Sequence, residues 1–112
     1  MHEASLVEGI LKIALEVAAE NRAEKISAIG LKIGDMAGVE LDALNFSFDV
    51  LKKNTIAENA ALKINHVPII AQCNKCGKTF NIARYNFFCP ECGGILILKS
   101  GRELLVEFVD CE

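Results

Sequence analysis

Apolar residues recur along the chain in two rhythms, and the change of rhythm predicts the order of the elements. From Ser5, or one turn earlier, to about Asn21, apolar residues return every three or four positions, which is typical of an amphipathic helix. The segment from Ile26 to Gly34 is rich in β-branched residues and alternates towards its end, which predicts a strand. A second helical spacing predicts a helix from about Leu41 to Lys53.

Two further strands are predicted, over residues 60–67 and 103–110, the second with Leu104, Val106 and Phe108 on one face. The last strand follows a cysteine-rich segment and is too short to fold alone, so it should return to the sheet of the first strand. If the first two strands are neighbours across the second helix, they run parallel. The predicted fold class is therefore α+β, with a small mixed sheet packed with two helices over residues 1–70 and 100–112 and an inserted module over 71–99.

Composition and charge narrow the class of protein. The 112 residues are 52% apolar and 24% charged with a formal net charge of −3, which indicates one small globular chain. Uncharged apolar runs such as residues 67–71 are far shorter than a membrane span, and the N-terminus lacks the apolar stretch of a secretory signal, so we expect a cytoplasmic protein that binds no membrane. Residues 72–100 differ from the rest, with four basic side chains against one acidic.

Four of the five cysteines form two C-x2-C pairs, Cys73 with Cys76 and Cys89 with Cys92, separated by 12 residues. Each pair can bend into a turn that points two thiolates at one ion, and four thiolates complete a tetrahedron around Zn2+ without an open position. This spacing predicts a structural zinc site in a zinc-ribbon-like module. A rubredoxin-like iron site and dithiol redox chemistry remain open, and Cys111 is interpreted as an incidental thiol, with transient metal binding or an intermolecular disulfide as alternatives.

The chain begins Met1-His2-Glu3, immediately before the first predicted helix. A free α-amine, a deprotonated His2 amide and the His2 Nδ1 atom can chelate one metal in nearly one plane, and the amide of Glu3 can complete four nitrogens. Such a planar set suits Ni(II) or Cu(II) better than tetrahedral Zn(II). From these residues alone, a solvated His2 without a ligand role remains the alternative.

Several motifs together resemble the HypA/HybF family of hydrogenase nickel-insertion proteins over the whole length of the chain. They are Met1-His2-Glu3 with Ser5-Leu6, Leu31-Lys32-Ile33-Gly34, Val39-Glu40 with Leu44 and Phe46-Ser47-Phe48, and the paired C-x2-C insert. The resemblance implies a nickel-binding α+β domain interrupted by a zinc domain. It also implies a metallochaperone that is not an enzyme and that delivers Ni(II), with the nickel GTPase HypB, to the large subunit of a [NiFe]-hydrogenase.

Residue by residue, the resemblance implies that His2 is the essential nickel ligand, with the Met1 amine and the Glu3 backbone completing the set. Glu3 and Glu40 are nearby carboxylates, and Glu40 reaches the site only if the second helix begins beside the first. The zinc ligands carried over are Cys73, Cys76, Cys89 and Cys92. Neither the residues nor the resemblance decides whether the chain forms a homodimer.

The main rival is a zinc ribbon that binds nucleic acid. It is favoured by basic and aromatic residues in the insert and weakened by the net charge of −3, so we expect no nucleic-acid partner. These residues are Lys75, Lys78, Arg84 and Lys99, with Phe80, Tyr85, Phe87 and Phe88.

Overall fold

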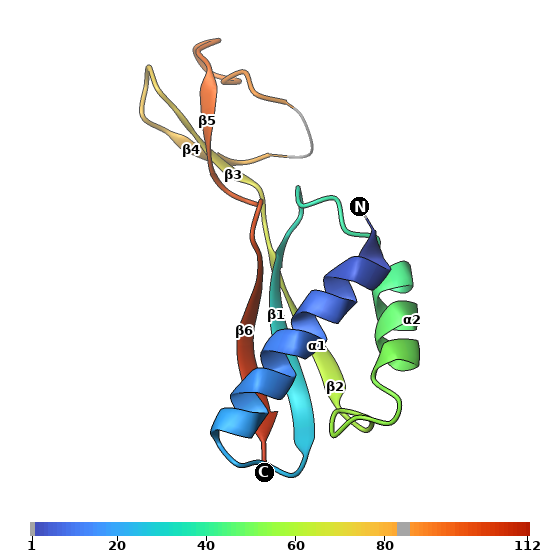
Figure 1. The fold of residues 1–112 in the computed structure, drawn as a ribbon. Coiled ribbons are helices and arrows are strands. Elements are labelled where there is room, and N and C mark those ends of the chain that lie inside the picture. The colour runs from blue at the N-terminus through green and yellow to red at the C-terminus, as the bar shows by residue number, and fades with distance from the viewer. Residues whose placement is uncertain (1, 83–85) are drawn as a thin grey trace. The chain divides into compact units, whose positions relative to one another are not determined.

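The computed structural model describes residues 2–82 and 86–112 and forms two helices and six strands within them (Figure 1). The chain divides into two compact units, one spanning 1–32, 38–65 and 105–112 and one spanning 33–37 and 66–104. The elements in chain order are α1 (Glu3–Glu20), β1 (Ile26–Gly34), α2 (Leu41–Leu51), β2 (Ala61–Val67), β3 (Ile70–Cys73), β4 (Thr79–Asn81), β5 (Leu96–Ser100) and β6 (Leu104–Cys111).

The first sheet has the order β2-β1-β6, so the earliest strand lies in its centre. The N–H of Ile26, where β1 begins, donates to the carbonyl of Ile56 ahead of β2 at 2.9 Å. The N–H of Asp35, just after β1, donates to the carbonyl of Val67 at the end of β2, also at 2.9 Å. Both strands therefore run in the same direction, as the sequence predicted for neighbours joined through a helix.

Strand β6 closes the other side of this sheet and runs against β1. Gly34 at the end of β1 donates to the carbonyl of Glu103 at 2.7 Å, while Glu112 donates to the carbonyl of Lys25 at 2.8 Å. The last strand thus returns to the first sheet, and the sheet is mixed, as predicted.

Helices α1 and α2 lie side by side and bury their apolar stripes with β1 (Figure 1). Leu44 and Phe48 of α2 are 0% and 2% exposed. Removing apolar side chains of this size from water is the main favourable term in folding such a chain. The other buried apolar residues on these three elements are Val7, Ile10, Leu11, Ala14, Ala18, Ile26, Ala28, Ile29, Leu31 and Ile33.

One predicted face of β6 is wrong. Leu104 and Val106 are half-buried, but Glu107 and Phe108 are consecutive exposed residues, so the alternation shifts by one position. The ring of Phe108 covers Gly30, where an added Cβ would lie 2.0 Å from it.

The second unit contains an antiparallel sheet of order β4-β3-β5. Predicted strand-like segments at 79–83 and 95–99 correspond to β4 and β5, with Ala83 outside the described residues, whereas β3 was not predicted. A small core lies against this sheet, formed by Ala71, Cys73, Cys89 and Leu96 with Phe80 and Ile82 packed on it. No helix in the described part of the chain is long and apolar enough to cross a membrane.

Two glycines let the backbone of the second unit close tightly. Gly101 adopts φ +120°, a left-handed conformation that side chains disfavour, and its carbonyl accepts the N–H of Met36 at 2.7 Å. A Cβ at Gly34 would lie 2.0 Å from that same Gly101 oxygen. Only glycine at position 34 permits this approach of the end of β1 to the connection before β6.

Candidate metal centres

The four cysteines of the paired motifs converge on one point. Their sulfur atoms all lie within 4.8 Å of one another, and they are the only group of metal-ligating side chains found among the described residues. The Sγ atoms of Cys73 and Cys92 are 3.5 Å apart, and those of Cys76 and Cys89 are 3.8 Å apart. Since Zn–S bonds of about 2.3 Å give a tetrahedral edge of about 3.8 Å, the cluster is compatible with a structural metal such as zinc.

The sequence folds locally into this cluster through two similar turns. Gly77 donates to the carbonyl of Cys73 at 3.0 Å, and Gly93 donates to the carbonyl of Cys89 at 2.9 Å. Both glycines have positive φ, 76° and 73°, and nothing lies within 4 Å of where a Cβ would be. Glycine is therefore required at these positions for conformation and not for space.

Backbone amides and neighbouring sulfurs set the charge of the cluster. The N–H groups of Cys76 and Lys75 each donate to Cys73 Sγ at 3.4 Å, and they lower the pKa of Cys73 to about 6. The Gly94 amide lowers the pKa of Cys92, but the adjacent Cys73 sulfur and burial outweigh it, so that this pKa is raised to about 11. A thiolate therefore forms at Cys73 near neutral pH, which is the form that a metal ligand needs.

An ion pair that the sequence analysis did not predict joins the two turns. Lys78 Nζ lies 2.6 Å from Glu91 Oε2, and this carboxylate is the main cause of the raised pKa of Lys78. The signal was present in the chain, because Lys78 follows one C-x2-C pair and Glu91 lies inside the other. The ion pair links the two halves of the motif on the solvent side.

Two of the aromatic residues that the structure describes in the insert, Phe80 and Phe88, differ in their surroundings. Phe80 packs against the core beside the cysteines, whereas Phe88 is 67% exposed. Arg84 and Tyr85, which the nucleic-acid hypothesis invoked, lie outside the described residues.

The N-terminal candidate ligand, His2, stands at the start of α1. It is the N-cap residue, its carbonyl accepts the N–H of Leu6 at 3.1 Å, and its side chain makes no capping hydrogen bond. The residue is exposed, so solvent or a partner can reach the imidazole. Met1, whose amine the sequence nominated, lies outside the described residues.

Glu3 and Glu40 meet where both helices begin. Glu3 Oε2 accepts the backbone N–H of Glu40 at 3.2 Å, and a Glu40 carboxylate oxygen accepts the N–H of Asp42 at 3.1 Å as the N-cap of α2. The Glu40 amide is the main cause of the lowered pKa of Glu3. Two helix N-termini favour negative charge, so this end of the molecule suits carboxylates. The second helix therefore does begin beside the first.

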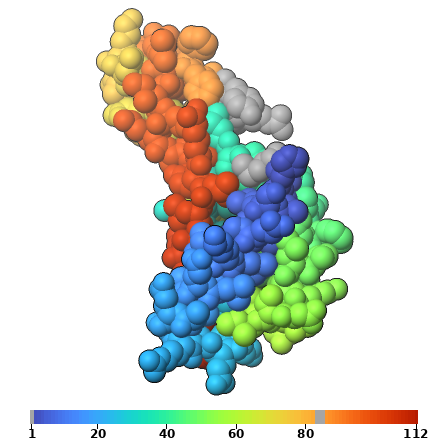
Figure 2. All heavy atoms as spheres, in the orientation of Figure 1, coloured from blue at the N-terminus to red at the C-terminus, as the bar shows by residue number. Residues whose placement is uncertain are grey.

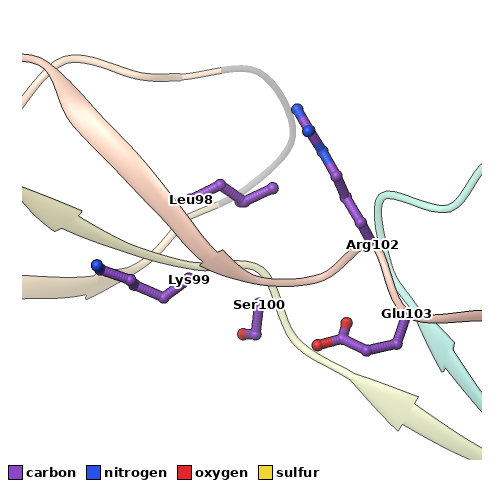
Figure 3. Close-up of a pocket in the computed structure, with 5 residues that line it drawn as sticks. All are labelled: Leu98, Lys99, Ser100, Arg102 and Glu103. Atoms are coloured by element: carbon purple, nitrogen blue, oxygen red, sulfur yellow. The ribbon is translucent and has the colours of Figure 1, made fainter.

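A shallow depression of about 300 Å3 lies where β5 leads into β6, lined by Leu98, Lys99, Ser100, Arg102 and Glu103 (Figure 3). Ser100 Oγ donates to the carbonyl of Pro68 at 2.8 Å, and Glu103 Oε1 accepts the N–H of Gly101 at 2.8 Å. The two cationic side chains point in different directions. Its polar groups thus stabilise the chain connection and do not converge on a ligand.

Comparison with known proteins assigns the chain to a family. Residues 1–111 match the family described as hydrogenase/urease nickel incorporation, metallochaperone, hypA. The chain belongs to the HypA family. A hydrogenase maturation factor HypA from Rhodobacter capsulatus is 44% identical over 108 residues and covers 96% of both chains. The same-named protein of Caldanaerobacter subterraneus is 35% identical over 114 residues and covers both chains fully.

Solved HypA structures share the fold. The solution structure of the Ni metallochaperone HypA from Helicobacter pylori has a TM-score of 0.69 at 22% identity and covers 99% of this chain and 97% of that one. A second solution structure of a HypA protein has a TM-score of 0.73 at 22% identity, covering 100% and 97%. The predicted α+β class is confirmed by these HypA neighbours together with the four-cysteine cluster.

Proposed function

We propose that this chain binds Ni(II) at its N-terminus and, together with the nickel-binding GTPase HypB, delivers it to the large subunit of a [NiFe]-hydrogenase. The nickel ligands are the Met1 amine, the amide and Nδ1 atoms of His2, and Glu3 through its backbone nitrogen or its carboxylate. On this proposal the chain is a cytoplasmic carrier and catalyses no reaction. Membership in a nickel-incorporation family supports it.

The observation that carries the proposal is the state of His2. It is exposed at the first turn of α1 with no hydrogen bond from its side chain to the helix, so its imidazole is available for a metal. The carboxylate of Glu3, the next residue, accepts the backbone N–H of Glu40 at the start of α2. A site at an exposed chain end can hold nickel in a planar nitrogen set and still be reached by the ligands of a recipient.

The cysteine cluster complements this site by holding a structural Zn2+. Four thiolates leave no open position, so this ion shapes the second unit and takes no part in transfer. The core beside the cluster is small, which makes metal binding and folding of the module one event.

The decisive experiment is a nickel titration of protein without an affinity tag, followed by absorption. We expect His2→Ala to lose high-affinity nickel and to retain its zinc. His66→Ala is the matched control, because His66 is the second exposed histidine of the described chain. An added residue before Met1 should act like His2→Ala, since it removes the amine from the chelate. Equal nickel affinity in His2→Ala and the parent would refute the proposal.

The zinc assignment has its own test. Cys73→Ala should lose zinc and the ordered signals of the insert, whereas Cys111→Ser should keep one zinc per chain. Zinc content by mass spectrometry of the native protein and amide NMR spectra provide the readouts. An iron-containing red protein, or a metal-free insert with unchanged amide dispersion, would contradict the assignment.

A further inference from the structure

The outward face of α2 carries two exposed apolar side chains one turn apart. Phe46 is 71% exposed, the highest value among the exposed large apolar residues of the described chain, and Val50 is 47% exposed. Their neighbours Leu44 and Phe48 are buried, so the helix packs one side inward and leaves Phe46 and Val50 in water. Figure 2 shows α2, in green, at the molecular surface beside α1. Nothing in the packing of α2 itself accounts for a phenylalanine at this position.

This pair stands on a line that leads to the proposed nickel ligands. Residues four apart share one face of a helix, so Asp42, Phe46 and Val50 form a single row along α2. The row starts at the N-terminus of α2, where the Glu40 amide contacts the carboxylate of Glu3. At 1.5 Å per residue, Phe46 lies roughly 9 Å along the helix axis from Glu40. A protein seated on Phe46 would therefore hold its own ligands close to the chain's N-terminus.

The charges around the row select the kind of partner. Asp42 lies one turn before Phe46, Asp49 precedes Val50, and the exposed Lys53 follows Val50 by three residues, so the negative charge that a partner meets comes from the whole unit and not from the row alone. Lys52 is turned towards the fold, with Nζ 3.3 Å from Asp49 and 5.2 Å from the centre of the Phe48 ring. The unit that contains α2 has 7 basic and 12 acidic side chains, a net charge of −5. The negative charge of this unit repels both a second copy of the unit and nucleic acid. It attracts a partner whose apolar groove is bordered by lysine or arginine side chains.

We infer that the Phe46–Val50 row is the docking surface for the protein that exchanges nickel with this chain, with Phe46 inserted into an apolar pocket bordered by cationic side chains. The inference rests on the proposed function, since it places the exchange partner beside the nickel ligands. It is a helix-in-groove contact in which one aromatic anchor supplies most of the affinity.

The test uses full-length chain, zinc-loaded and nickel-free, titrated with purified HypB by calorimetry. We expect Phe46→Ala to weaken binding at least tenfold and Val50→Ala several-fold. Leu105→Ala is the matched control, because Leu105 on β6 is 48% exposed against 47% for Val50, and it should change affinity less than twofold. Asp42→Asn should also bind HypB more weakly than the parent does, and its affinity should depend less on salt concentration.

Separate readouts distinguish failure of this inference from failure of the proposed function. Phe46→Ala should bind nickel as tightly as the parent but transfer it more slowly to HypB, whereas His2→Ala should lose nickel and keep its affinity for HypB. Parental affinity for HypB in Phe46→Ala, or no binding of the parent chain, would overturn the docking assignment. A parent that sediments as a dimer while Phe46→Ala sediments as a monomer would overturn it as well, in favour of a second copy.

Discussion

Three glycine-to-alanine changes should affect stability in different directions, because the structure gives each added methyl group a different neighbour. At Gly34 the Cβ would lie 2.0 Å from the Gly101 oxygen, about 1.4 Å short of ordinary contact at 3.4 Å. This neighbour is backbone, so it cannot rotate aside. Moving the two backbone segments apart by that amount would break two 2.7 Å hydrogen bonds, from the Gly34 N–H to the Glu103 carbonyl and from the Met36 N–H to the Gly101 carbonyl.

The cost at Gly34 follows from these contacts. Two lost backbone hydrogen bonds at about 1 kcal/mol each, with overpacking of about 1–3 kcal/mol, lower the free energy of unfolding by about 3–5 kcal/mol. At Gly30 the methyl group meets the side chain of Phe108, which is 37% exposed and can swing into water, so we expect a loss of about 1–2 kcal/mol. At Gly9, in the middle of α1, no atom lies within 4 Å, so alanine should stabilise by about 0.5–1 kcal/mol.

Urea unfolding with zinc present, followed by circular dichroism at 222 nm, measures all three variants under one protocol. From the most to the least stable, the expected order is Gly9→Ala, the parent, Gly30→Ala and Gly34→Ala. A Gly34→Ala protein within about 1 kcal/mol of the parent, or one no less stable than Gly30→Ala, would refute the steric reasoning.

Three further predictions concern other contacts. The folded-state pKa of Glu3 is lowered, so the hydrogen bond from the Glu40 amide to Glu3 stabilises the folded protein above the ordinary pKa of about 4.3 and is lost as pH falls through the lowered value. The Glu40 amide NMR signal should therefore shift with pH below about 4.3, and it should not shift in Glu3→Gln. Lys78→Ala and Glu91→Ala should each speed zinc loss to a chelator no more than a few-fold, and the double variant should match the single ones; additive effects would show that the two residues act separately. Leu44→Ala should cost about 2–5 kcal/mol in urea unfolding, whereas Phe46→Ala should leave stability within about 0.5 kcal/mol; equal losses would contradict the burial assigned to α2.

Local patterns were sufficient where a segment's partners are close in sequence. The strand predicted at 26–34 has the observed bounds, because its β-branched run is buried along nearly its whole length. Helix α1 begins at Glu3 with His2 as its N-cap, within the turn before Ser5 that the sequence also allowed, because apolar spacing alone does not fix the end of a helix. Strand β3 was missed because it has four residues, too few to show a period, and follows Pro68.

The candidate sites divide in the same way. The cysteine quartet could be predicted because each C-x2-C pair is a local turn, and two such pairs at this spacing are typical of a metal site. The exposed row of α2 was not readable, because Phe46 and Phe48 are the same residue type two positions apart, and only packing decides that one is buried and the other is in water.

The sequence by itself predicted the two helices, the central strand and the cysteine quartet, because periodicity and short spacings encode them directly. It also predicted the last strand's return to the first sheet, because that strand is too short to fold alone. Only the tertiary structure decided that Glu3 meets Glu40, 37 positions away, and that Phe108 covers Gly30. These contacts join segments distant in the chain, and their formation depends on how the helices pack on the sheet and on the shift in β6. No local pattern carries that information, because the same residues satisfy the same propensities in either arrangement.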